Sequence, residues 1–150
     1  MSLEQCVKIV ERSSREYEQA LDLRYDKIYG QLNIPRHLIT DELEDKCDHY
    51  VCVLDNVVVA YARMMVFSDG VAEYSEIVMD KTEIGQEACK RLIGKMTQIC
   101  QERAVKIIQL FAPKVDIEFY QKIGFVSSEL EFMSKRTKML YIPMRKELAV

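Results

Sequence analysis

Residues 71–96 decide how this chain folds, and they read V-A-E-Y-S-E-I-V-M-D-K-T-E-I-G-Q-E-A-C-K-R-L-I-G-K-M. The stretch from Val71 to Met79 is rich in apolar and β-branched residues and follows the turn pair Asp69-Gly70, which predicts a strand. From Ala88 onward, apolar residues recur at three- and four-residue steps. This spacing predicts a long helix from about Gly85 to about Arg103.

The loop between this strand and this helix has two interpretations. It is either an ordinary connection or a site for a ligand that carries phosphate. A helix N-terminus presents several unpaired N–H groups and the positive end of the helix dipole. Together these features attract phosphate groups. The loop residues alone leave both interpretations open.

Length and composition indicate one globular domain, residues 1–150, with 49% hydrophobic and 30% charged residues. The net charge of −3 and a pI near 5.5 argue against a nucleic-acid binder. No apolar run approaches the roughly 18 to 20 residues that cross a bilayer, so no membrane span is expected. The first residues, M-S-L-E-Q-C-V-K, lack the apolar core of a signal peptide, which predicts a cytoplasmic protein.

The cysteines are odd in number and show no spacing typical of metal ligands. We therefore expect no metal site, no disulfide, and reduced cysteines that are mostly buried. One alternative is that Cys89 is a nucleophile, because a helix N-terminus lowers the pKa of a thiol. The five cysteines are Cys6, Cys47, Cys52, Cys89 and Cys100.

The N-terminal third predicts one strand and two helices. A first strand is expected over Val7 to Glu11. Ser13 stands three residues before Glu16, the spacing of a capping box, and predicts a helix start. Gly30 is expected to end this helix, and a short second helix is expected after the break at 33–36.

An acidic run follows this break, with five carboxylates within eight residues. It is either a solvated loop or an acidic rim that attracts a cationic amine such as a polyamine or an aminoglycoside. The residues are Asp41, Glu42, Glu44, Asp45 and Asp48.

The rest of the chain predicts mainly strands. Asp55-Asn56 and Asp69-Gly70 separate three antiparallel strands over 50–54, 57–67 and 71–79. A strand over 107–111 follows the long helix and is expected to lie parallel to the strand over 71–79. A short helix within 112–124, ended by Gly124, precedes strands over 125–132 and 138–144. The predicted fold is an α+β, three-layer αβα domain, with a mixed, mostly antiparallel sheet of about seven strands and four helices.

The stretch 119–125 reads F-Y-Q-K-I-G-F, follows a short buried strand and is similar to the late motif of the GNAT acetyltransferase superfamily. The order of predicted elements agrees with that superfamily over nearly the whole chain. The earlier residues resemble a branch of small GNAT proteins with the pattern L-R…L-x-x-P…H…A-R-[LM]. The matching residues are Leu23-Arg24, Leu32-Asn33-Ile34-Pro35, His49 and Ala62-Arg63-Met64.

The resemblance implies an N-acetyltransferase that moves an acetyl group from acetyl-CoA to a primary amine of a small molecule or peptide by direct attack. In this family a β-bulge in the strand over 71–79 frees a backbone N–H for the thioester oxygen. Tyr120 is then the general acid, or else a core tyrosine with its hydroxyl at the surface. Glu73 is the first choice for the general base and Glu76 the second. His49 is a third, although a structural role suits a lone histidine better.

The resemblance also implies residues that hold acetyl-CoA. Strand alternation places Glu73 and Glu76 on opposite faces, so they share a site only if the bulge is present. Many proteins of this family form dimers, so a homodimer is expected by analogy. The expected acetyl-CoA contacts are Ile77, Val78 and Met79 through the backbone, the loop residues Ile84, Gly85, Gln86, Glu87, Ala88 and Cys89, and Phe119.

The loop departs from the family pattern [QR]-x-x-G-x-[GA]. Ile84 replaces the basic or amide residue and Glu87 replaces the central glycine. A carboxylate at this position competes with pyrophosphate, although Lys81, Lys90 and Arg91 lie near enough in sequence to compensate. Three functions therefore remain. The first is an N-acetyltransferase with reorganised CoA binding, and the second is a GNAT fold that has lost catalysis and serves as a binding or regulatory module. The third is a protein that takes another acyl-CoA or a different phosphorylated ligand in the same cleft.

Overall fold

Turn residues shape the first half of the sheet as the sequence predicts. Asp55 and Asn56 adopt positive φ angles of 50° and 64° and join β2 (Asp48–Leu54) to β3 (Val57–Val66) in a two-residue hairpin. Gly70, with a φ of 84°, leads into β4 (Val71–Met79). β1 (Val7–Val10) pairs antiparallel with β2 at the outer edge. The predicted antiparallel meander is confirmed.

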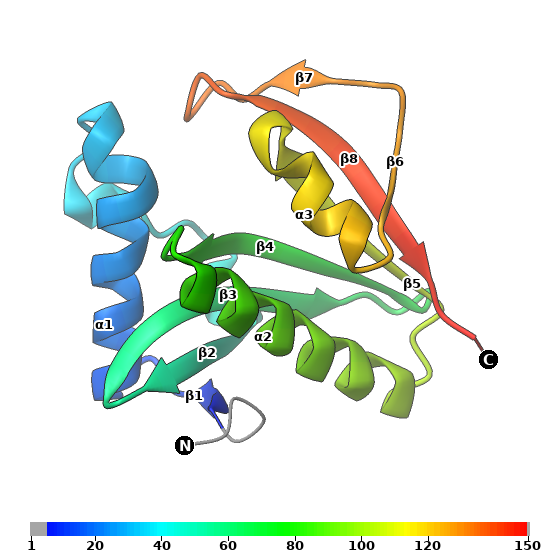
Figure 1. The fold of residues 1–150 in the computed structure, drawn as a ribbon, viewed down its shortest axis with the longest axis horizontal. Helices are drawn as coiled ribbons and strands as arrows, with labels where there is room; N and C mark the ends of the chain where they lie inside the picture. The colour runs from blue at the N-terminus through cyan, green and yellow to red at the C-terminus, as the bar shows by residue number, and fades with distance from the viewer. Residues whose placement is uncertain (1–5, 150) are drawn as a thin grey trace.

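The computed structural model describes residues 6–149, in which eight strands form one mixed sheet (Figure 1). The last four strands are β5 (Ile107–Pro113), β6 (Val126–Ser127), β7 (Phe132–Met133) and β8 (Leu140–Glu147). The strand order is β1-β2-β3-β4-β5-β8-β6, and β7 pairs with β8. β4 and β5 (Ile107–Pro113) are parallel, but their register spans only three pairs, from Val71 with Ile107 to Glu73 with Gln109. Beyond Glu73 the two strands diverge, and Figure 1 shows the sheet opening into a fork between them.

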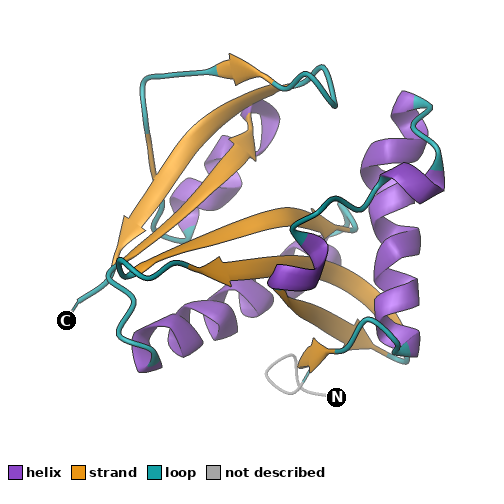
Figure 2. Cartoon of the chain, turned by 180° about the vertical axis from the view of Figure 1, so that it is seen from behind, coloured by secondary structure: helices purple, strands orange, loops and turns teal. Residues whose placement is uncertain are grey.

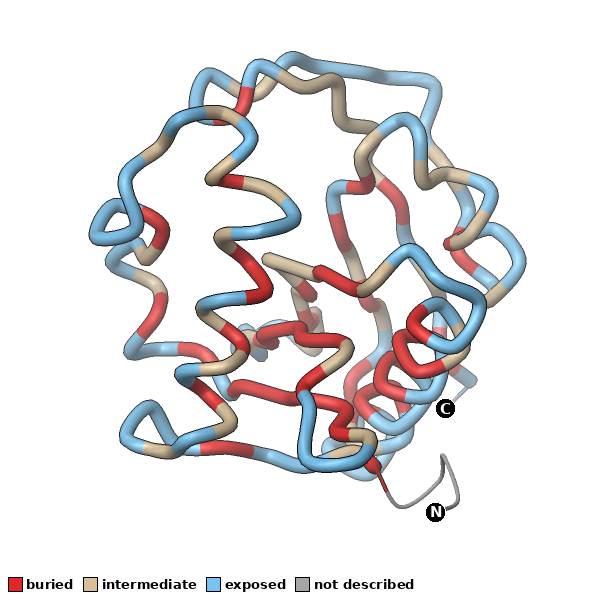
Figure 3. Tube along the Cα trace, turned by 60° about the vertical axis from the view of Figure 1, so that its left-hand side comes forward, coloured by how far each residue is buried: buried red, intermediate tan, exposed pale blue. Residues whose placement is uncertain are grey.

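The helices cover both faces of the sheet. α1 (Arg15–Arg24) packs on one face, where Tyr17 and Leu23 join Val51 and Tyr61 in one apolar cluster. α2 (Glu83–Glu102) and α3 (Ile117–Lys122) lie on the other face, above the larger cluster. Figure 3 shows that α2 is buried along its inward side and exposed on its outer side. This is the predicted three-layer arrangement, and α2 follows the apolar period that the sequence displays.

The predicted numbers of strands and helices were wrong for the described residues, which contain eight strands and three α-helices. The strand predicted over 125–132 is broken into β6 (Val126–Ser127) and β7 (Phe132–Met133), both of which pair with β8 (Leu140–Glu147). The Ser128 hydroxyl accepts the Leu130 N–H at 2.9 Å and turns the chain away from the ladder. The second predicted helix is only a 3₁₀ turn over Arg36–Leu38.

Both ends of the first helix also differ from the prediction. Ser14, not Ser13, caps α1, because its hydroxyl accepts the Tyr17 N–H at 3.1 Å. The helix does not end at Gly30. It continues as a π-helical turn over Tyr25–Tyr29 and a 3₁₀ turn over Gly30–Leu32. Asn33 ends it with a φ of 59°. Figure 2 shows the connection from α1 to β2 as short helical turns joined by loops.

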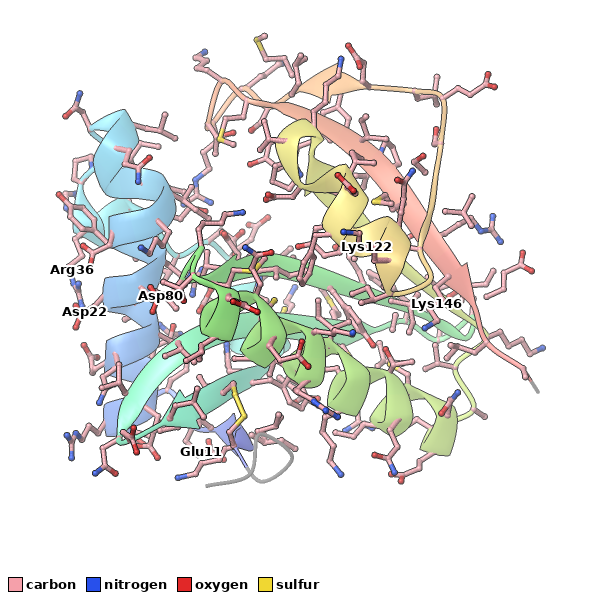
Figure 4. All side chains as sticks on the ribbon, viewed as in Figure 1. Glu11, Asp22, Arg36, Asp80, Lys122 and Lys146 are labelled. Atoms are coloured by element: carbon pink, nitrogen blue, oxygen red, sulfur yellow. A yellow bond between two sulfur atoms is a disulfide. The ribbon has the colours of Figure 1, made fainter. Side chains whose placement is uncertain are left out.

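The expectation that all cysteines are reduced was wrong. Cys6 and Cys52 form a disulfide, visible beside β1 in Figure 4. The antiparallel register of β1 and β2 brings their Cα atoms to 4.9 Å, which suits a disulfide. Cys47, Cys89 and Cys100 are free and buried, as predicted. No group of metal-binding side chains was found among the described residues, and none of their helices is long and apolar enough to span a membrane.

Candidate active site

A bulge in β4 creates the centre of the candidate site. The register of β3 and β4 runs from Tyr61 with Val78 directly to Arg63 with Ser75, so β4 has an extra residue opposite Ala62. Glu76 carries this irregularity with a φ of 52°, in the left-handed region. Bulges of this kind redirect side chains at functional sites.

The bulge changes the faces predicted for β4. Up to Ser75 the strand alternates as expected, but Glu76 joins Ser75 on the side of α1 instead of opposing it. Tyr74 and Met79 then lie in the cluster under α2, whereas Val78 lies in the cluster under α1. Strict alternation would place Met79 on the same face of the strand as Ser75. This was wrong, because the extra residue of the bulge moves Met79 to the opposite face.

The two carboxylates proposed as bases occupy different surroundings. Glu73 is half-buried, accepts a hydrogen bond from Gln109 Nε2 at 3.3 Å, and does not line the cavity described below. Burial raises the pKa of Glu73, against the lowering effects of Gln109 and Arg63. The two carboxylate oxygens of Glu76 accept hydrogen bonds from the Tyr29 hydroxyl at 2.5 and 2.7 Å. The π-helical turn that follows α1 therefore places the Tyr29 side chain against the bulge.

A cavity of about 230 Å³ opens at the fork. Glu76 and Ile77 of the bulge, Tyr120 of α3 and Arg136 from the connection before β8 all contribute to its wall. The structure thus brings together two of the three predicted catalytic side chains, Tyr120 and Glu76. The remaining lining residues are Ile28, Tyr29, Arg63, Tyr74, Ser75, Phe111, Pro113, Ser134, Thr137 and Tyr141.

Tyr120 is almost fully buried, with 2% of its surface exposed. Burial, with smaller contributions from Cys89 and Asp116, raises its pKa well above 10. The phenol therefore keeps its proton at neutral pH. Phe119 packs edge-on against it with ring centroids 5.1 Å apart.

A buried ionic cluster under α1 supports the site. Glu44 accepts hydrogen bonds from Arg24 at 2.7 and 3.1 Å, from Arg63 at 2.8 Å and from Tyr17 at 2.5 Å. Burial alone would raise the Glu44 pKa, but the hydrogen bonds and charges of these partners lower it to about 2. Arg24 also approaches Glu76, with Nη2 at 3.5 Å from Oε1. We call Arg24, Glu44 and Arg63 the ionic cluster.

This cluster bears on two interpretations of the sequence, the acidic rim and the role of His49. Glu44 is 1% exposed and Asp41 forms a bidentate pair with Arg63 at 2.8 and 3.0 Å, so neither belongs to a free acidic rim. His49 lies against the cluster and not in the cavity lining. Its ring nitrogens contact the Tyr61 hydroxyl at 2.7 Å and the Glu44 carbonyl oxygen at 2.9 Å, and burial lowers its pKa. This geometry favours the structural role for His49.

The ionic cluster was not predicted from the sequence, although the sequence contains a signal for it. Arg24, His49 and Arg63 are the polar positions of the branch pattern L-R…H…A-R-[LM]. They are more than ten residues apart in sequence, yet they meet around one carboxylate. Polar residues at fixed positions within apolar strands are a signal for such a buried cluster, because a buried charge needs a partner.

The start of α2 is built around Gly85. A Cβ on this residue would lie 2.1 Å from the Asp80 carbonyl oxygen, so only glycine allows the helix to pack so closely on the end of β4. Thr82 caps α2 by accepting the Gly85 N–H at 3.0 Å. Ala88 and Cys89 are fully buried in the core, so their side chains face the sheet. Complete burial raises the Cys89 pKa to about 12, against the nucleophile hypothesis.

Two grooves of about 290 and 320 Å³ lie between the start of α2 and α3. Both contain Phe119, Gln86 and Lys122 in their walls, and Met79 lines the first. Figure 4 shows Lys122 on α3, and both grooves have Lys122 and Gln86 in the same wall. Among the predicted loop residues, Ile84 is 63% exposed.

Charges in these grooves are mixed. Lys81 pairs with Asp116 at 2.6 Å, and Lys122 lies 3.5 Å from Glu118. Glu87, the residue that replaces the family glycine, lies 3.7 Å from Arg91. The pairs of Lys122 with Glu118 and of Arg91 with Glu87 are exposed and contribute little stability, so a phosphate can exchange with their carboxylates at low energetic cost.

Comparison with known proteins identifies the family to which this chain belongs. The acetyltransferase (GNAT) family model matches residues 6–125, and the chain belongs to this family. No protein of curated function matches the sequence. Among solved structures, ElaA of Escherichia coli has 22% identity and a TM-score of 0.74, with 94% of this chain and 99% of that chain covered.

Two further solved structures show the same fold. An aminoglycoside 6'-acetyltransferase type Ii has 15% identity and a TM-score of 0.76, with 96% of this chain and 97% of that chain covered. An aminoglycoside 6'-N-acetyltransferase complexed with coenzyme A has 12% identity, a TM-score of 0.75 and the same coverage. At these identities the likeness concerns the fold.

Proposed function

We propose that the protein transfers an acetyl group from acetyl-CoA to a primary amine of a small molecule or peptide by direct attack. The observation that carries this proposal is the cavity at the fork, whose wall combines a carboxylate on a bulge with a buried, protonated tyrosine. Amide formation from a thioester requires a proton acceptor for the amine and a proton donor for the departing thiolate. Glu76 and Tyr120 supply these two groups.

The open edge of β4 is suited to a pantetheine chain. From Tyr74 to Met79 this edge has no β5 partner within the described register, so its backbone groups are available to a ligand. We assign the backbone of Ile77, Val78 and Met79 to this contact. The N–H groups of Gly85 and Gln86 are already bonded to Thr82, so the lysines of the grooves would hold the phosphates, helped by the positive end of the α2 dipole. Phe119, which lines both grooves, would pack against the pantetheine.

The chemistry follows from these positions. The neutral amine nitrogen attacks the thioester carbonyl carbon, and the Ile77 N–H at the bulge stabilises the charge that develops on the carbonyl oxygen. Glu76 takes the proton that the attacking nitrogen loses. The carbon–sulfur bond breaks, and Tyr120 donates its proton to the thiolate. Glu73 is the alternative base, but it lies outside the cavity lining.

The test is release of the CoA thiol from acetyl-CoA with a panel of primary amines. We expect the wild type to release thiol only when an amine is present. Glu76→Gln and Tyr120→Phe should each lower kcat by at least 100-fold, because general acid–base groups contribute about 10²–10⁴-fold. Tyr120→Phe should change the acetyl-CoA affinity little. Tyr25→Phe, which alters a half-buried tyrosine outside the cavity lining, is the matched control. An unchanged rate in Tyr120→Phe would remove that residue from the mechanism.

The altered loop around Glu87 favours a second function, a binding module without catalysis. The same assay separates the two. If the wild type releases no thiol with any amine and does not bind acetyl-CoA, the protein is better described as a binding module.

A further inference from the structure

Arg136 lies in the wall of the cavity and bridges two connections. It is 35% exposed, and its Nη2 donates a hydrogen bond to the Leu38 carbonyl oxygen. Its guanidinium lies over the Tyr29 ring, 4.8 Å from the centroid. The residue therefore connects the turn before β8 with the segment that follows α1, directly above Glu76.

The turn that carries Arg136 is well defined. The Ser134 hydroxyl accepts the N–H groups of Arg136 and Thr137, both at 3.2 Å. The Lys138 N–H donates to the Ser134 carbonyl oxygen at 2.9 Å, and Lys138 has a φ of 60°. These bonds hold the backbone of Arg136 before any ligand arrives, which reduces the entropy lost on binding.

Arg136 and Arg63, the two arginines of the cavity wall, differ in how many of their N–H groups are used. Arg63 donates through Nε to Ser75 and through both terminal nitrogens to Asp41, and it is 3% exposed. Arg136 lies 3.7 Å from Glu76 and 4.0 Å from Asp41, both beyond hydrogen-bond length. Because a guanidinium has five N–H donors, Arg136 retains donors for a planar anion.

The position of Arg136 beside Glu76 suggests the class of acceptor. We propose that the acceptor is an α-amino acid, whose amine meets Glu76 and whose carboxylate meets Arg136. This inference rests on the proposed function and names the substrate of the same site. Arg136 Nη1 and Glu76 Oε1 are 3.7 Å apart. An α-amino acid carries its amine and its carboxylate on one carbon atom, so it can contact this adjacent carboxylate and guanidinium at the same time.

The rest of the wall favours an apolar side chain of modest size. Ile28, Phe111 and Pro113 present apolar surface, and the cavity of about 230 Å³ has room for about eight water molecules at ~30 Å³ each. A polyamine has no group for Arg136, and the carboxylates of Asp41 and Glu44 are already paired with arginines. Peptide N-termini lack a carboxylate beside the amine.

Binding without acetyl-CoA is the direct test. Leucine, methionine and phenylalanine are titrated by calorimetry at pH 8, each beside its amide, which keeps the amine and removes the carboxylate charge. We expect at least one amino acid to bind at least tenfold more tightly than its amide. This preference should disappear in Arg136→Met and persist in Arg145→Met, which alters an arginine on β8 that pairs with Glu147.

Three binding results would overturn the inference: equal affinity for acid and amide, a preference retained in Arg136→Met, or no binding of any amino acid of the panel. Thiol release with the amides at the rate of the acids would also overturn it while supporting acetyl transfer. Conversely, Arg136-dependent binding of amino acids without thiol release would uphold the amino-acid site and refute the proposed transfer reaction.

Discussion

Replacing Glu44 with glutamine tests how strongly the ionic cluster holds the site. Glu44 is 1% exposed and accepts hydrogen bonds from two buried arginines. Glutamine has nearly the same shape but leaves Arg24 and Arg63 with one negative charge fewer. Removing one partner of a buried ion pair destabilises a protein by about 3–5 kcal/mol. We expect this loss at pH 7, a large part of a total stability of about 5–15 kcal/mol.

The pH dependence gives an independent measure of the same interaction. The pKa of Glu44 falls from its ordinary value of 4.5 to about 2, which corresponds to about 3 kcal/mol of folding free energy at neutral pH. Because the native state keeps the carboxylate charged while the unfolded state takes up a proton near pH 4.5, this contribution is complete above that pH. It is lost as the pH falls toward 2, and about 2 kcal/mol is gone by pH 3.

Urea unfolding from pH 7 to pH 3 measures both effects. The difference in unfolding free energy between wild type and Glu44→Gln should shrink by about 2 kcal/mol over this range. Glu129→Gln, a change at an exposed carboxylate on the connection between β6 and β7, is the control and should follow the wild type. A Glu44→Gln protein within about 0.5 kcal/mol of the wild type at pH 7, or a constant difference across the range, would refute the reasoning.

Two further predictions concern α2. Gly85→Ala should lower the unfolding free energy by about 1–3 kcal/mol, because the new methyl group meets the Asp80 carbonyl oxygen at 2.1 Å. Gly94→Ala should instead raise the unfolding free energy by about 0.5–1 kcal/mol, because no atom lies within 4 Å of the new methyl group. Urea unfolding measures both variants, and a change of the same sign in both would contradict the packing of α2. Cys89, with its pKa raised to about 12 and no exposed surface, should resist iodoacetamide at pH 8 until the protein is unfolded, as mass spectrometry of the peptides would show. Labelling in the native state at the rate of an exposed thiol would show that this helix opens.

Local signals in the sequence were enough to predict much of the fold. Asp55-Asn56 and Gly70 adopt the positive φ angles that their turns require, and Gly124 does so after α3, with a φ of 101°. The apolar period of α2 predicts which of its sides faces the sheet, and burial confirms it. Each of these features depends on residues close together in the chain, where the residue type alone restricts the backbone.

Features that depend on distant residues were not predictable in the same way. The disulfide joins Cys6 and Cys52, which are 46 residues apart in sequence, and it depends on how β1 and β2 pair. The hydroxyl that donates to Glu76 belongs to Tyr29, which reaches it because the helix continues past Arg24 as a π-helical turn. Composition and periodicity do not contain that information, because it arises when the layers pack.

The same limit applies to the candidate site. Tyr120 and Glu76 were named from a motif and a strand, but the choice between Glu73 and Glu76 depends on the bulge. The bulge itself is a single extra residue in β4 relative to β3. Only the register shows that Glu76 lies in the cavity wall and that Glu73 lies against Gln109.

Calorimetric titration of acetyl-CoA tests the central claim most directly, because acetyl transfer requires that the altered loop still holds this ligand. We predict that the wild type binds with a Kd between about 1 μM and 1 mM, the usual range for enzyme substrates. Glu87→Gln should bind about fivefold more tightly, since one charge about 4 Å from a phosphate contributes about 1 kcal/mol in water. Glu129→Gln should match the wild type. No binding by the wild type at millimolar acetyl-CoA, with binding restored in Glu87→Gly, would contradict the account and show that this chain retains the acetyltransferase fold without its co-substrate.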